Sequence, residues 1–149
     1  MIAEEKAKGE RRKAMADEEK AEGEGRKAMA GSRGSPDLLE RTKQFALRVI
    51  AVFRALPREE AARVLGRQVL RSGTSVGAQY REAQRAKSSA DFISKIEGAL
   101  QELEETRYWI ELLSEAGIIP ANRLTSLHDE ATQLIAIFMT IARRTKRQP

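Results

Sequence analysis

Apolar residues recur at helical spacing in four stretches of the chain, with charged and polar residues between them. The first stretch follows Ser35 and Pro36, which are typical of a helix N-cap and of the first helical position. It stops at Pro57, because proline lacks a backbone donor and clashes with the preceding turn. We therefore predict a helix over residues 36–56, with these apolar positions mostly on one face: Leu38, Phe45, Val49, Phe53 and Leu56.

Two more helices are predicted in the middle of the chain. Pro57 can open the second, which runs from about Arg58 to Ala86. The third begins at a Ser88 and Asp91 pair that resembles a capping box. It ends at Gly117, a typical left-handed C-cap residue. Their core positions are predicted to be Leu65, Val69 and Val76 in the second helix, and Phe92, Ile96, Leu100, Leu103, Ile110 and Leu113 in the third.

The last helix begins at Pro120 and has the clearest apolar stripe of the four. All connections between the predicted helices are short, which favours antiparallel neighbours. The sequence therefore predicts an all-α protein, an antiparallel up-down-up-down four-helix bundle over residues 35–149.

Residues 1–34 differ in composition from the rest of the chain. The segment Ala3 to Ala16 is followed by a near copy, Asp17 to Ala30, in which three positions differ. Neither copy has a large apolar stripe, so we expect a disordered or marginally helical tandem repeat and linker. A duplicated stretch of DNA would explain the repeat, with Met29 a candidate start, and a charged arm that touches a partner is the alternative.

Composition excludes several classes of protein. The chain has no Cys, so it has neither disulfides nor a thiolate zinc site, and a reducing compartment, the cytoplasm, is expected. No apolar run approaches the roughly 20 residues that cross a bilayer, so we expect no membrane partner.

Positive charge is concentrated outside the repeats. The net charge is +5, and residues 1–30 contribute nothing to it because they hold eight basic and eight acidic residues. Most of the remaining basic residues are Arg, which binds phosphate through two nitrogens, although a GC-rich genome gives the same bias. A solvated basic C-terminus is the alternative to phosphate binding there. The candidate nucleic-acid-binding residues are Arg63, Arg67, Arg81, Arg85, Lys87, Arg143, Arg144, Lys146 and Arg147.

Gly73 and Gly77 are an unusual feature of the second helix. Each glycine costs about 1 kcal/mol relative to Ala in a helix interior. Close approach of another helix would offset that cost, and a break or kink is the alternative. Because apolar residues occupy more than one face of this helix, we expect a neighbouring subunit to cover the second face.

A row of polar residues on the second helix can face two acidic residues on the third. Four of them lie about one turn apart, and buried charges persist only when they are paired. We interpret the set as a network that fixes helix register or forms a subunit seam, with a binding site as the alternative. It comprises Arg71, Ser75, Gln79 and Glu82 on the second helix and Glu102 and Glu105 on the third, and Gly73 and Gly77 belong to the same candidate seam.

Chemistry of other kinds has little support in the sequence. His128 is the only histidine, so no second histidine can complete a metal site, and we expect a solvated surface residue. The chain also lacks a phosphate-binding loop and the paired Glu-x-x-His motifs of bundle metal sites. We expect no enzyme, no metal and no cofactor.

The segment Gln68 to Ile119, which begins QVLRSGTSVGAQYREAQRAKSS, resembles the four helix bundle family that includes proteins encoded in bacterial 23S ribosomal RNA intervening sequences. The resemblance extends more loosely over about Leu38 to Lys146. It implies a protomer that forms a ring-shaped homopentamer. It also implies kinship with the accessory variability determinant of diversity-generating retroelements, which associates with a reverse transcriptase and nucleic acid. Most members have no settled biochemical role.

Two hypotheses about function follow. The first is an oligomeric helical bundle that binds structured nucleic acid, RNA or an RNA–DNA hybrid, through its basic patches. The second is a homo-oligomeric adaptor that docks a protein partner such as a reverse transcriptase.

Overall fold

The structure, a computed structural model, describes residues 6, 8 and 36–147. Residues 36–147 form four helices, α2 (Pro36–Ala55), α3 (Glu60–Gln84), α4 (Ser89–Glu115) and α5 (Ala121–Arg147), and contain no strand. The prediction of an all-α protein with four helices is confirmed. The predicted cap at Ser35 lies outside the described residues, as do the repeats of the N-terminus apart from Lys6 and Lys8.

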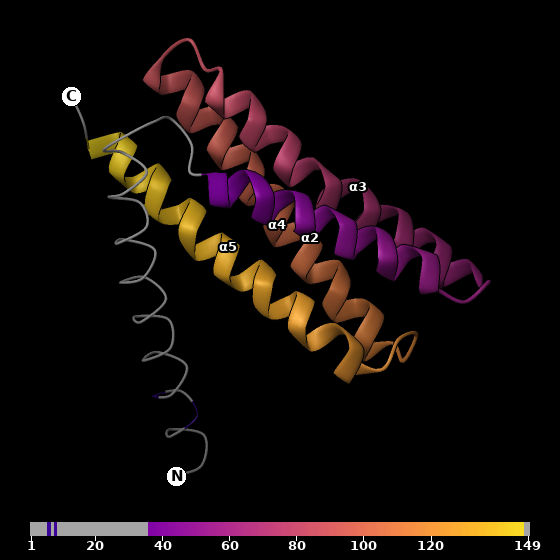
Figure 1. Cartoon of the computed structure of the whole chain (residues 1–149). Helices are drawn as coiled ribbons and strands as arrows, with labels where there is room; N and C mark the ends of the chain where they lie inside the picture. The colour runs from indigo at the N-terminus through magenta and orange to yellow at the C-terminus, as the bar shows by residue number, and fades with distance from the viewer. Residues whose placement is uncertain (1–5, 7, 9–35, 148–149) are drawn as a thin grey trace.

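The helices pack side by side in chain order (Figure 1). Along the contact between α2 and α3, residue numbers decrease on α2 as they increase on α3. Leu56 lies against Gly66, Val49 against Gly73 and Thr42 against Gly77. The same relation holds between α4 and α5. Successive helices therefore run in opposite directions along the bundle (Figure 1).

Pro57 does not open the second helix, contrary to the sequence prediction. Because a residue before proline is disfavoured in the helical conformation, α2 ends at Ala55, ahead of Leu56. The backbone N–H of Glu59 donates to the Pro57 carbonyl at 3.0 Å in the connection that reverses the chain. α3 begins only at Glu60, with Glu59 as its extended N-cap residue.

The predicted ends of the third helix are confirmed. Ser88 is the N-cap of α4, and its hydroxyl accepts the backbone N–H of Asp91 at 3.1 Å. The Asp91 carboxylate in turn accepts the backbone N–H of Lys87 at 3.2 Å. At the other end Gly117 has a φ of 72°, and the N–H of Ile118 donates to the Leu113 carbonyl at 3.0 Å, as in a glycine-terminated helix.

The two unusual glycines admit a helix of the same chain. A Cβ atom at Gly73 would lie 2.7 Å from Cγ2 of Val49, and one at Gly77 would lie 3.2 Å from Oγ1 of Thr42. Both partners are on α2, and α3 continues through the glycines without a break. The predicted close approach is confirmed, but its placement at a subunit seam is wrong for Gly73 and Gly77, because α2 already covers them.

The core runs the length of the bundle and draws on all four helices. Tyr80 of α3 and Phe138 of α5 meet edge to face across it, with ring centroids 5.6 Å apart. The largest side chains that are fully buried come from every helix: Phe45 and Val49, Val69 and Val76, Ile96, Leu103 and Ile110, and Leu134 and Phe138.

Candidate functional site

Arg71 joins α3 to α4 by pairing with two carboxylates. Its Nη1 lies 3.3 Å from Oε2 of Glu102, and its Nη2 lies 3.2 Å from Oε2 of Glu105. The Arg71 side chain is half exposed, whereas that of Glu102 is 18% exposed. The predicted approach of Arg71 to these two acids is therefore confirmed.

The rest of the predicted polar row does not join this group. Ser75 donates to the carbonyl of Arg71 at 2.7 Å, within its own helix. Gln79 lies against Gly98, and Glu82 pairs with Lys95 at 3.1 Å. Instead of one continuous network, the line of contact between α3 and α4, the α3–α4 seam, holds separate short contacts, because α4 offers a different partner at each turn.

The two ionisable groups at the centre of this seam titrate abnormally. Burial raises the pKa of Glu102 above its ordinary value. The positive charge of Arg71 lowers this pKa, and the negative charge of Glu105 raises it, so the net shift is upward. The hydrogen bond that Arg71 donates to the Glu105 carboxylate raises the pKa of Arg71, so the arginine stays charged. The seam therefore holds one cation between two carboxylates, of which the buried one gains protons readily.

A buried pair of hydroxyls at the same seam was missed by the sequence reading. Oγ1 of Thr106 lies 2.7 Å from Oγ of Ser72, and both side chains are fully buried. Ser72 donates to the carbonyl of Gln68 at 2.8 Å. The signal available in the sequence was a small hydroxyl residue at a core-facing position of each helix. The two hydroxyls form a hydrogen bond with each other between α3 and α4.

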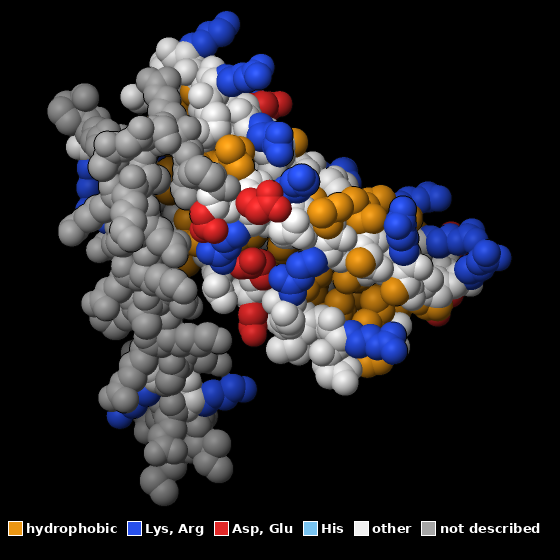
Figure 2. Space-filling view, in the orientation of Figure 1, with side chains coloured by type: hydrophobic (Ala, Val, Ile, Leu, Met, Phe, Trp, Pro, Cys, Tyr) orange, Lys and Arg blue, Asp and Glu red, His pale blue; other side chains and the backbone are white. Residues whose placement is uncertain are grey.

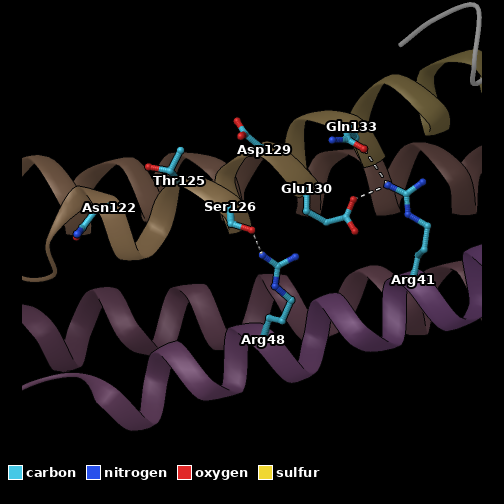
Figure 3. A pocket seen from close by; sticks show the side chains of 8 residues that line it. All are labelled: Arg41, Arg48, Asn122, Thr125, Ser126, Asp129, Glu130 and Gln133. Carbon is cyan, nitrogen blue, oxygen red and sulfur yellow. Dashed lines mark hydrogen bonds and ion pairs between the residues drawn. The ribbon is translucent and has the colours of Figure 1, made fainter.

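A polar groove of about 540 Å³ lies between α2 and α5 and was also missed (Figure 3). Arg41 of α2 pairs there with Glu130 and donates to Gln133 at 3.3 Å. Arg48 donates to the Ser126 hydroxyl at 2.8 Å. Because these side chains already form ion pairs and hydrogen bonds with one another, the main role of the groove is to hold α2 against α5. These two helices make few other contacts.

The predicted basic residues fall into two groups with different surroundings. One group lies at the two ends of α3, is exposed, and has no guanidinium ion pair within residues 36–147. On the face seen in Figure 2, Lys and Arg side chains stand out at both ends of the bundle. The members of this group are Arg63, Arg67, Arg81 and Arg85.

In the second group, most of the basic residues at the end of α5 are already engaged. Lys146 pairs with Glu97 of α4. Arg143 and Arg144 also have interaction partners. Lys87 lies in the exposed connection between α3 and α4, and Arg147 is exposed at the last position of α5.

His128 is not simply solvated, contrary to the sequence prediction. Its Nε2 lies 2.9 Å from Oε1 of Glu111, because α4 and α5 bring the two side chains together. No cluster of three or more metal-ligating side chains occurs in the described part of the chain. Among the described helices, none has the length and apolar character needed to cross a membrane.

Comparison with known proteins finds matches to the family model and to a solved structure. Residues 36–140 match the family of the 23S rRNA-intervening sequence protein. A crystal structure of a protein with unknown function from the S23 ribosomal protein family of Bacteroides thetaiotaomicron is 37% identical, with a TM-score of 0.67. That match covers 70% of this chain and 97% of the other. No curated protein matches significantly. The family match spans all of α2, α3 and α4 and most of α5, so this chain belongs to the 23S rRNA-intervening sequence protein family.

Proposed function

We propose that this protein is a non-enzymatic, cytoplasmic helical bundle that assembles with copies of itself and binds structured nucleic acid through basic patches. The name of its family refers to sequences that interrupt ribosomal RNA, which makes RNA the first ligand to consider. The net charge of +5 favours a polyanionic ligand.

The observation that carries this proposal is how the arginines of the bundle are distributed. Arg41 and Arg71 lie at contacts between helices and are paired with carboxylates there. Arg63, Arg67 and Arg81 of α3 and its C-cap residue Arg85 are exposed and have no such pair within residues 36–147. An unpaired guanidinium on the surface can take a phosphate without first giving up a carboxylate, so the outer face of α3 is the primary candidate surface.

The basic residues beyond this face form a secondary surface in the proposal. Lys87 follows α3 at the same end of the bundle as the C-terminus of α5, where Arg143, Arg144, Lys146 and Arg147 lie. Contacts from these residues would add to those of α3 if a nucleic acid reached across that end.

Self-assembly, with a ring-shaped homopentamer as the proposed form, is supported by apolar side chains left in solvent. Leu47 on α2 is 48% exposed, and Val64 on α3 is 54% exposed. Tyr108 and Met139 are also exposed on α4 and α5. In a ring, identical weak phosphate contacts would reinforce one another through a high effective concentration.

The test is a salt titration of binding to a folded ribosomal RNA fragment, with duplex DNA of equal length as competitor. Each phosphate contact is expected to contribute about −0.9 to the slope of log binding constant against log salt concentration. Tight binding that weakens steeply with salt supports the proposal. Absent or salt-independent binding at low salt overturns it.

The exposed apolar side chains also support a second candidate function, an oligomeric adaptor that docks a protein such as a reverse transcriptase. Hydrophobic side chains gather on one half of the face in Figure 2, toward the α2–α3 connection. Large exposed apolar patches are typical of protein interaction sites. A gene for such an enzyme nearby, together with a pull-down that survives nuclease, would favour this function over the first.

A further inference from the structure

Four arginines that have no carboxylate partner within residues 36–147 recur along α3 at a constant spacing, the last of them, Arg85, at its C-cap. Arg63 and Arg81 are 18 residues apart, and so are Arg67 and Arg85. At 3.6 residues per turn, that separation is five whole turns, so Arg63 and Arg81 point from the same side of the helix. Arg85 directly follows the last helical residue, Gln84, as the C-cap of α3. The two pairs are about 27 Å apart at about 1.5 Å per residue.

The surface between the two arginine pairs is neutral and includes the half-buried Leu70. Thr74 is half-buried and Ala78 is exposed there. Arg71, the cation nearest the middle, is neutralised by its two carboxylates on α4. The outer face of α3 therefore presents two cationic points with a low, uncharged centre.

Acidic residues do not cancel these two points. Glu59, the N-cap residue of α3, and Glu60 in its first turn lie about one turn before Arg63 and make no ion pair with it, and Glu82 pairs with Lys95. Each end of the face therefore keeps a pair of guanidinium groups about one turn apart, within reach of neighbouring phosphates.

The face lacks the features that single-stranded nucleic acids require. Proteins that bind single strands stack bases on aromatic side chains. The aromatic residue of α3, Tyr80, is buried against Phe138, and Tyr108 and Trp109 lie on α4. A rigid helix with two fixed cationic points instead fits a rigid polyanion, whose phosphates stand in a regular array.

We infer that α3 is a two-point clamp for duplex nucleic acid, in which Arg63 with Arg67 and Arg81 with Arg85 each hold phosphates. This inference rests on the proposed function and names its ligand class and surface. A span of about 27 Å corresponds to about eight base pairs at ~3.4 Å each. A duplex shorter than this cannot engage both arginine pairs of one α3 helix at once.

The experiment compares hairpins with stems of about 6 and about 14 base pairs closed by the same loop, each made as DNA and as RNA. The full chain should bind the longer stem at least about tenfold more tightly, because the second contact becomes intramolecular. The variant Arg81→Gln/Arg85→Gln should lose that advantage and lower the salt slope on the longer stem by about 1.8. On the short stem the same variant should bind within about twofold of the wild type, because the other pair suffices.

A matched control removes two arginines elsewhere. Arg107 lies on α4 and Arg123 on α5, so Arg107→Gln/Arg123→Gln makes the same change in net charge without touching α3. This control should keep the length dependence, and native mass should show that every variant retains the wild-type assembly. Comparing DNA with RNA stems tells which duplex is preferred.

The outcomes separate the two proposals. If the wild type binds neither stem in a salt-sensitive way, the proposed function itself fails. If the wild type binds but the Arg81→Gln/Arg85→Gln variant weakens both stem lengths equally, or if the stem length has no effect, nucleic-acid binding stands and the two-point clamp is wrong.

Discussion

Nη1 of Arg71 lies 3.3 Å from Oε2 of Glu102 across the α3–α4 seam, and yet the pKa of Glu102 is raised. Burial destabilises the charged form of Glu102 more than the positive charge of Arg71 stabilises it. Arg71 also pairs with Glu105, so its attraction is shared between the two carboxylates. The ion pair therefore fixes the position of α4 against α3 more than it stabilises the fold.

This balance predicts an inverted pH dependence for Glu102. Because its folded pKa lies above its ordinary value, near 4.5, the native state binds the proton more readily than the unfolded state. The contribution of Glu102 to stability is fully present below the ordinary value and is lost as the pH rises through the folded pKa. In chemical unfolding, Glu102→Gln should therefore gain stability relative to the wild type as the pH rises from about 4 to 7.

The control for this prediction is Glu104→Gln, because Glu104 lies two residues away on α4 and is exposed. Glu104→Gln removes the same charge from α4 but keeps Glu102, so it measures the effect of the change in net charge alone. Parallel pH profiles for the wild type and Glu102→Gln would contradict the prediction.

Gly73→Ala should destabilise the bundle although alanine favours helices. The new Cβ would lie 2.7 Å from Cγ2 and 2.8 Å from Cγ1 of the fully buried Val49, so α2 or the valine must shift. Overpacking of this kind costs about 1–3 kcal/mol, against about 1 kcal/mol gained from helix propensity. Urea unfolding should show a net loss, and the loss should shrink in a Val49→Ala background.

Gly98→Ala is the matched comparison on α4. There the new Cβ would meet the amide end of Gln79 at 3.1 Å, and that flexible side chain can move aside. The substitution should be neutral or stabilise by up to about 1 kcal/mol. Equal losses of unfolding free energy for Gly73→Ala and Gly98→Ala would show that the close approach of α2 does not explain the glycine at position 73.

The Ser72–Thr106 hydroxyl pair should contribute a measurable coupling between α3 and α4. Thr106→Val keeps the shape of the side chain but removes the contact at 2.7 Å, which should cost about 1 kcal/mol. Combined with Ser72→Ala, the total loss should be smaller than the sum of the two single losses. Thr125→Val, at an exposed hydroxyl that bonds only its own helix, should change stability by less than about 0.5 kcal/mol.

The sequence predicted the helices well because their signals are local. The Ser88 cap and the left-handed Gly117 depend on hydrogen bonds within a few residues, and both are present. The start of α3 was predicted wrongly at Pro57, because proline is favoured both at a first helical position and in a turn. The path of the chain between α2 and α3 determines that Pro57 lies in the turn.

The contacts between helices were harder to predict because they depend on register. Arg71 was correctly placed near Glu102 and Glu105, since long charged side chains tolerate small errors of position. The partner of Glu82 was missed, because that pair requires the exact depth at which Lys95 meets α3. Gly73 and Gly77 correctly predicted a close helix, but only the fold shows that this helix is α2 of the same chain.

The two groups of basic residues should differ in how strongly they bind nucleic acid. Lys146 already pairs with Glu97, and Arg143 and Arg144 have partners as well, so each must exchange an existing contact for a phosphate. The α3 arginines have no ion pair to give up within residues 36–147, so neutralising them should remove more phosphate contacts. We expect the salt slope to fall by about 0.9 for each α3 arginine changed to Gln, and by less per residue for Arg143→Gln/Arg144→Gln/Arg147→Gln. Fluorescence anisotropy with one folded RNA at several salt concentrations gives the salt slope of each variant. A larger fall in the slope per residue for the C-terminal variant would place the main contact surface at the end of α5 instead of on α3.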